Sequence, residues 1–113
     1  MKKVLSIAGS DCSGGAGIQA DLKTFSAHGV FGMSVIVSVV AENTSRVIDI
    51  QDITPDMIEK QIDAVFEDIE VDAVKIGICH HSAVRYKSCC CGTERFILRK
   101  GKETWILMRQ SLI

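Results

Sequence analysis

Runs of apolar residues divide the first 77 positions of the chain and predict buried strands. The runs at residues 4–8 and 33–40 are nearly uninterrupted and rich in β-branched residues, which is typical of parallel strands buried on both faces. Residues 72–77 predict a further strand that ends at a glycine. Residues 47–50 are few and predict a short strand at a sheet edge.

Two segments between these runs carry apolar residues at helical spacing. In the first, Ile18, Leu22 and Phe25 recur on one face, and Gly29 offers a place for the helix to end. The second begins at residues 54–55 with a threonine that can cap a helix and a proline suited to its first turn. Its apolar face consists of Ile58, Ile62, Val65, Phe66 and Ile69.

The order strand, helix, strand, helix, strand predicts an α/β fold, in which crossover helices join the strands of a parallel sheet. The carboxyl-terminal third does not continue this order, and we expect it to be irregular. It offers two weak candidate strands, at residues 96–98 and 104–107.

Charge changes abruptly near residue 78, although the 113-residue chain as a whole has a formal net charge of −1. Residues 1–78 carry 6 Lys+Arg against 12 Asp+Glu, whereas residues 79–113 carry 7 against 2. Four of the five cysteines also lie in the second part. We therefore expect a regular α/β segment at residues 1–78 and a separate tail at residues 79–113.

Composition also limits the location and the partners of the protein. No apolar run approaches membrane-spanning length, and the one after Lys3 is too short for a signal peptide, so we expect a cytoplasmic protein that binds no membrane. The basic residues of the tail are scattered, which argues against nucleic acid. The cysteines and histidines of the tail lack zinc-site spacing, so no metal site is predicted from Cys79, His80, His81, Cys89, Cys90 and Cys91.

The loop at residues 9–17 is rich in glycine, serine and aspartate. Gly9 and Gly14 have the spacing of a phosphate-binding P-loop, but the lysine and hydroxyl residue that should follow are absent. Residues 15–20 match a dinucleotide-binding pattern, with Glu42 as the ribose-binding acid, but the first glycine lies too far from the strand. The loop exceeds what a turn needs and follows the carboxyl end of a strand, which predicts contact with a ligand.

Five sequence blocks, in the same order, carry a resemblance to a known family. They are residues 7–11, 13–25, 32–35, 41–44 and 71–77. Over residues 3–77 the chain resembles the amino-terminal part of hydroxymethylpyrimidine/phosphomethylpyrimidine kinases. The resemblance implies a partial ribokinase-like fold and ATP-dependent phosphorylation of 4-amino-5-hydroxymethyl-2-methylpyrimidine and its phosphate in thiamine biosynthesis. Pyridoxine and pyridoxal kinases are similar, which makes their activity the alternative.

The resemblance assigns four residues to a pocket for the pyrimidine. It places Ala16 near the ring, Asp21 near the hydroxymethyl group and Val40 in the wall. Glu42 takes the position that contacts the ring edge, where the common pattern has glutamine. An ionised glutamate only accepts hydrogen bonds, so a ring proton or a protonated Glu42 is needed to complete the pair. On the sequence alone, a solvated position is the simpler interpretation of Asp21, and Glu42 suits the surface as well as a site.

The resemblance also implies ATP and Mg²⁺ as cofactors, a small pyrimidine as partner and a homodimeric complete enzyme. The family's nucleotide site and catalytic residue belong to later sequence, so none is predicted here and the chain alone is expected to be inactive. A non-catalytic pyrimidine-binding fragment is the second alternative. Because the match stops where the composition changes, we expect residues 79–113 to be read out of frame, and a divergent or spliced tail is the alternative.

Overall fold

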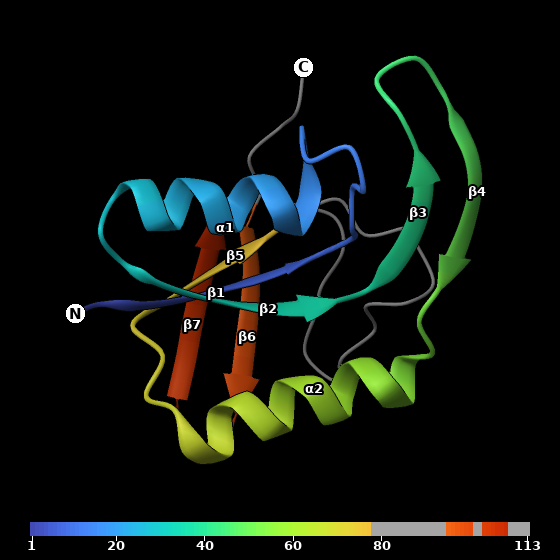
Figure 1. The fold of residues 1–113 in the computed structure, drawn as a ribbon. Helices are drawn as coiled ribbons and strands as arrows, with labels where there is room; N and C mark the ends of the chain where they lie inside the picture. Colours follow the sequence, from blue (N-terminus) through green and yellow to red (C-terminus); the bar gives the residue numbers. More distant parts are fainter. Residues whose placement is uncertain (78–94, 101–102, 109–113) are drawn as a thin grey trace.

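The computed structural model describes residues 1–77, 95–100 and 103–108, with side chains in the first segment. Its central elements are β1 (Lys3–Ala8), α1 (Gly17–Ala27), β2 (Phe31–Ile36), α2 (Pro55–Asp68) and β5 (Ala73–Ile76). The three strands form a parallel sheet in the order β2-β1-β5, with one helix on each face (Figure 1). The predicted α/β fold with crossover helices is thereby confirmed.

The core lies between the sheet and α2. Successive residues of a strand point to opposite faces of its sheet. Leu5 and Ile7 of β1 are fully buried in one cluster with Ile58 and Ile62 of α2. Ser6, between them, is equally buried but bonds to a side chain of α1. The face of the sheet toward α2 is therefore apolar, and the face toward α1 admits polar groups.

We expect Ile62→Ala to lower the free energy of unfolding by about 2–5 kcal/mol, because the truncated side chain leaves a cavity in the core. The Ile62 side chain is 2% exposed. Met57→Ala, on the same helix at a side chain that is 50% exposed, is the control and should change this free energy by less than about 0.5 kcal/mol. Urea denaturation measures both values, and equal losses would place Ile62 outside the core.

The single strand predicted at residues 33–40 is wrong, because the chain breaks there into two strands. β2 ends at Ile36, and a second strand, β3 (Ser38–Glu42), leaves the parallel sheet. Between them, Val37 donates its N–H to the Ala8 carbonyl over 3.0 Å. Since β1 ends at Ala8, the residues after Val37 have no strand of the parallel sheet beside them, and their backbone groups bond to another strand.

The new partner of β3 is β4 (Val47–Asp52), and the two form an antiparallel hairpin that projects from the sheet (Figure 1). The edge strand predicted at residues 47–50 is therefore half of this hairpin. Ser10 holds the glycine-rich loop against it in two places. Its N–H donates to the Ser38 carbonyl over 2.9 Å, and its hydroxyl oxygen accepts the N–H of Val40 over 3.1 Å.

The outer edge of β2 is bonded by a side chain of α2. The Gln61 amide oxygen accepts the N–H of Ile36 over 3.0 Å, and its amide nitrogen donates to the Ile36 carbonyl over the same distance. One side chain thus makes both of the bonds that a neighbouring strand would make to this residue.

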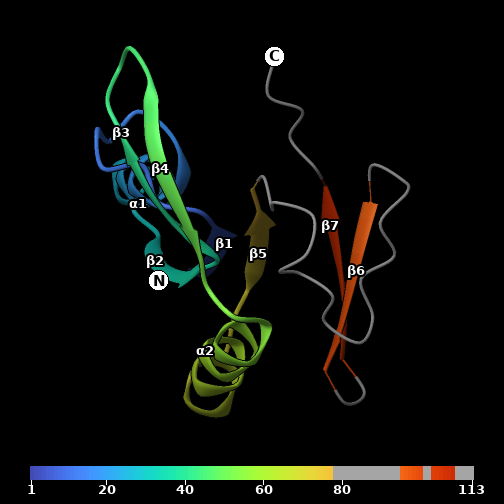
Figure 2. The same cartoon turned by 90° about the vertical axis from the view of Figure 1, so that its right-hand side faces the viewer.

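The described part of the tail is a second antiparallel hairpin, of β6 (Arg95–Lys100) and β7 (Glu103–Met108). The two weakly indicated strands are present, so these segments are not irregular. Figure 2 shows β7 beside β5, with β6 on its far side. The cysteine and histidine cluster at residues 79–91 lies outside the described residues. In the described part of the chain, neither helix is long and apolar enough to cross a membrane.

Candidate functional site

The glycine-rich loop is folded around one buried carboxylate, that of Asp11. This group accepts the backbone N–H of Ser13, Gly15 and Ala16 over 2.8–3.0 Å and the hydroxyl of Ser13 over 2.5 Å. The Ser13 hydroxyl, followed by these backbone donors, holds the pKa of Asp11 below its ordinary value. The loop therefore has an internal anion that fixes its shape.

This internal anion also decides what the loop can bind. Loops that cradle phosphate do so with backbone N–H groups ahead of a helix. Here Asp11 already accepts the N–H groups of Gly15 and Ala16, immediately before α1 begins at Gly17. The structure thus gives a physical reason why the spacing of Gly9 and Gly14 does not make a P-loop.

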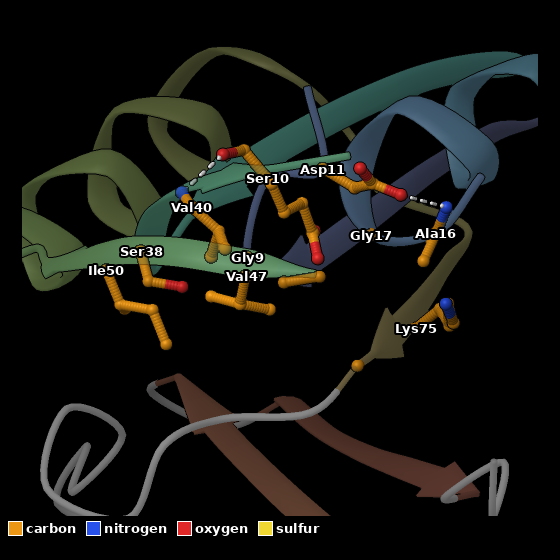
Figure 3. A pocket seen from close by; sticks show the side chains of 13 residues that line it. Gly9, Ser10, Asp11, Ala16, Gly17, Ser38, Val40, Val47, Ile50 and Lys75 are labelled. Carbon is orange, nitrogen blue, oxygen red and sulfur yellow. Dashed lines mark hydrogen bonds between the residues drawn. The ribbon is translucent and has the colours of Figure 1, made fainter. Parts of the chain in front are cut away.

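A cavity of about 240 Å³ lies between this loop, the β3–β4 hairpin and the end of β5 (Figure 3). Alternate residues of β3 face it, because side chains of a strand alternate between its two faces. Three of the four residues assigned from the sequence, Ala16, Val40 and Glu42, line this cavity. The other lining residues are Ala8, Gly9, Ser10, Asp11, Gly17, Ser38, Val47, Ile50, Lys75 and Gly77.

Glu42 lies where the hairpin meets the loop, facing Asp11. Partial burial, and then the charge of Asp11 and a hydrogen bond with it, raise the pKa of Glu42 above its ordinary value. Glu42 consequently takes up a proton more readily than a solvated glutamate. Once protonated, its carboxyl group both donates and accepts hydrogen bonds, as a glutamine amide does.

Cys12 ties the tip of the loop to the end of β3. Its thiol donates to the Glu42 carbonyl over 2.8 Å, and its sulfur accepts the Glu42 N–H over 3.4 Å. These contacts fix the backbone of Glu42 while its side chain faces the cavity.

Asp21, the fourth assigned residue, lies outside the lining of the cavity. It projects from α1 toward the sheet, where it accepts the Ser6 hydroxyl over 2.6 Å and forms an ion pair with Lys75 over 2.5 Å. Lys75 does line the cavity. Asp21 is therefore linked to the cavity indirectly, by its ion pair with Lys75 of β5.

Comparison with known proteins places this arrangement in a family. The family model described as phosphomethylpyrimidine kinase matches residues 11–87, about two thirds of the chain. The chain belongs to this family. It is 60% identical over 74 residues to the hydroxymethylpyrimidine/phosphomethylpyrimidine kinase of Rhizobium meliloti, and 55% identical over 80 residues to that of Escherichia coli. These matches cover 66% and 69% of the chain but 28% and 30% of the relatives.

Solved structures agree with this family assignment. A phosphomethylpyrimidine kinase from Clostridium difficile is 60% identical, with a TM-score of 0.67, over 69% of this chain and 34% of that one. A pyridoxal kinase from Staphylococcus aureus, in complex with AMP-PCP and pyridoxal, is 42% identical, with a TM-score of 0.62, over 69% and 29%. The predicted family and partial ribokinase-like fold are confirmed, and the chain spans about a third of these kinases.

The described residues do not fit the ATP and Mg²⁺ that the kinase family implies. Asp11 already accepts the N–H groups of Gly15 and Ala16, so these groups do not serve as the backbone donors that cradle a triphosphate. Within these residues, no group of three or more His, Cys, Asp or Glu side chains could hold a metal ion. No step of phosphoryl transfer is assigned to this part of the chain.

Sequence reasoning did not assign Asp11 and Lys75 to the site, although both carried a signal. Asp11 stands two positions before Ser13, the spacing of a turn in which an aspartate bonds the backbone ahead of it. Lys75 is a charged residue in an otherwise apolar strand, where an unpaired charge would be costly.

Proposed function

We propose that this chain forms the pyrimidine-binding part of a hydroxymethylpyrimidine/phosphomethylpyrimidine kinase. The complete enzyme would transfer a phosphoryl group from ATP to 4-amino-5-hydroxymethyl-2-methylpyrimidine, or to its phosphate, in thiamine biosynthesis. The observation that carries the proposal is that Ala16, Val40 and Glu42 line one cavity. Family membership and the names of the relatives support the reaction.

The cavity has the size and lining that a single polar ring needs. At about 240 Å³ it is smaller than the pockets of roughly 300–1,000 Å³ that take drug-sized ligands. Val40, Val47 and Ile50 provide apolar surface for ring faces, and Glu42 provides a polar contact for a ring edge. Asp21 does not line the cavity, so its proposed place near the hydroxymethyl group rests on its ion-pair partner Lys75, which does line it.

Pyridoxal kinase activity is the second candidate, since the Staphylococcus aureus pyridoxal kinase shares this part of the fold. Isothermal titration calorimetry of the 113-residue chain with each compound separates the two candidates. We expect the hydroxymethylpyrimidine to bind at least about 10-fold more tightly than pyridoxal, because an aminopyrimidine offers an amino donor beside a ring nitrogen acceptor to Glu42. The reverse order would contradict the first proposal.

We expect Glu42→Gln to preserve pyrimidine binding and to flatten its dependence on pH, because the amide donates and accepts at any pH. In the wild-type chain, affinity for the neutral pyrimidine should fall as pH rises through the raised pKa of Glu42, where the carboxyl loses its proton. Glu42→Ala should weaken binding by roughly 5- to 150-fold, since a buried ring donor or acceptor loses its partner. Calorimetric titrations between pH 4.5 and 8 measure these effects, and unchanged affinity in Glu42→Ala would remove Glu42 from the site.

The same raised pKa affects stability with a defined sign. A carboxyl group whose pKa is higher in the folded than in the unfolded chain stabilises the fold below its unfolded pKa. That contribution is lost as pH rises through the folded pKa of Glu42. Glu42→Gln should therefore be relatively more stable than the wild-type chain near neutral pH.

We also propose that the complete kinase is a homodimer. The hairpin supports this with large apolar side chains outside the cavity, since Val39 is 50% and Ile48 is 61% exposed. Light scattering on the complete kinase tests the proposal, and a monomeric mass at all concentrations would contradict it.

We propose that residues 79–113 are translated in a different reading frame from the part of the gene that matches the family. The change in charge near residue 78 supports it, although the family model extends to residue 87. Translating the gene in all three frames tests it. We expect a neighbouring frame to continue the α/β pattern, and early stop codons in both other frames would contradict it.

A further inference from the structure

The cavity is lined by charged side chains of both signs. Three charged side chains line it: Asp11 from the loop, Glu42 from the hairpin and Lys75 from β5. The carboxyl groups of Asp11 and Glu42 line the same cavity and lie near enough for the charge of Asp11 to raise the pKa of Glu42. Lys75 lies at the β5 end, away from Val47 and Ile50 of the hairpin (Figure 3). A ligand in this cavity therefore meets two acidic side chains and one ammonium side chain.

Lys75 is held in place from the side of the sheet that faces α1. Its ammonium pairs with Asp21 over 2.5 Å, and Asp21 in turn accepts the hydroxyl of the fully buried Ser6 over 2.6 Å. The side chain of Asp21 is 12% exposed, and that of Lys75 is 31% exposed. The inner end of this chain of bonds is thus shielded, and its outer end is Lys75, a residue that lines the cavity.

This anchoring leaves Lys75 with hydrogen-bonding capacity. An ammonium carries three N–H donors. Within residues 1–77, Asp21 accepts one of them, which leaves two for a ligand. Because Asp21 balances the charge, the ammonium can remain partly buried without a ligand, yet it can still bind an anionic oxygen through charge-assisted hydrogen bonds.

We propose that Lys75 is a specificity-determining residue of this cavity. Its ammonium binds the oxygen substituent of the substrate and raises the affinity for the phosphorylated pyrimidine relative to the alcohol. Asp21 positions Lys75 by fixing the direction of its ammonium. The inference rests on the proposed function, because it takes the pyrimidine and its phosphate as the ligands.

The test compares two dissociation constants in the full 113-residue chain. Calorimetry gives Kd for 4-amino-5-hydroxymethyl-2-methylpyrimidine and for its monophosphate in the wild type, in Lys75→Gln and in Lys75→Arg. We expect Lys75→Gln to lower the affinity for the monophosphate by about 10-fold or more and that for the alcohol by less than about 3-fold. Lys75→Arg keeps the charge and should restore most of the difference.

Two further variants guard against a purely structural effect. Lys60→Gln removes an exposed lysine of α2 that pairs with Asp56, and it should change neither constant. If Lys75→Gln fails to fold because Asp21 loses its partner, the double variant Asp21→Asn with Lys75→Gln removes both charges together. It should show the same selective loss of monophosphate affinity.

The outcomes separate the inference from the proposed function. Equal losses for both ligands in Lys75→Gln and in the double variant would show that Lys75 only supports the fold, and would overturn its role in specificity. Binding of the pyrimidine with an unchanged ratio of the two constants would do the same while leaving the proposed function intact. Failure of the folded wild-type chain to bind either compound would contradict both.

Discussion

Gly17→Ala should lower the free energy of unfolding by about 3 kcal/mol or more and abolish pyrimidine binding. Gly17 has a φ of 59°, which an alanine adopts only at a cost of roughly 1–2 kcal/mol. A methyl group there would also overlap the carbonyl oxygen of Gly9, which accepts the N–H of Ile18 over 3.0 Å at the start of α1. Relieving that overlap requires the loop and the helix to separate.

The chain offers a matched control in Gly29, which also has a positive φ, 69°, but has open space where a Cβ would lie. Gly29→Ala should therefore show the conformational cost alone, roughly 1–2 kcal/mol, with pyrimidine binding retained. Urea denaturation and calorimetric titration measure the two effects in both variants. Equal destabilisation by the two substitutions would show that the close approach of Gly17 to Gly9 adds nothing to the cost of the Gly17 substitution.

Asp11→Ala is expected to have the second largest effect, a fall in Tm of about 10 °C or more together with loss of the ligand site. The substitution removes the acceptor of four hydrogen bonds and leaves the N–H groups of Gly15 and Ala16 without it. Asp56→Ala, at an exposed ion pair of α2, is the control and should shift Tm by less than about 2 °C. Differential scanning calorimetry distinguishes these results, and a similar shift in both variants would contradict the role of Asp11.

The Asp11 variant also predicts two changes with pH. Because the folded pKa of Asp11 is depressed, its stabilising contribution is present above the unfolded pKa and is lost as pH falls through the folded pKa. Acid should therefore destabilise the wild type more steeply than Asp11→Ala below about pH 4. Removing the Asp11 charge should also lower the pKa of Glu42, which NMR titration of its side chain would detect.

The order of helices and strands followed from the sequence because apolar spacing reflects which faces are buried. The break at Val37 did not, since residues 33–40 are β-branched almost throughout and favour a strand on either side of it. What ends β2 is the end of β1 at Ala8, a tertiary relation that no local pattern contains.

Some residues of the site could likewise be predicted from the sequence, and others could not. Ala16, Val40 and Glu42 were assigned from resemblance, and the structure places them around one cavity. Asp21 was assigned as well, but its separation from the cavity depends on Lys75, which is 54 residues away in the chain. Local propensity could not reveal that relation, because it arises when β5 pairs with β1 beneath α1.

The Gln61 side chain makes the two edges of the parallel sheet unequal as places where another strand could pair. A strand approaching the outer edge of β2 would have to displace the amide that already makes both bonds to Ile36. The other edge strand, β5, has no such side chain bonded to it in the described part of the chain. The edge of β5 is also the edge that β7 lies beside, so in this chain the hairpin of β6 and β7 is on the β5 side. Gln61 thereby makes the addition of a strand at Ile36 of β2 costlier than at an edge whose backbone groups bond only to water.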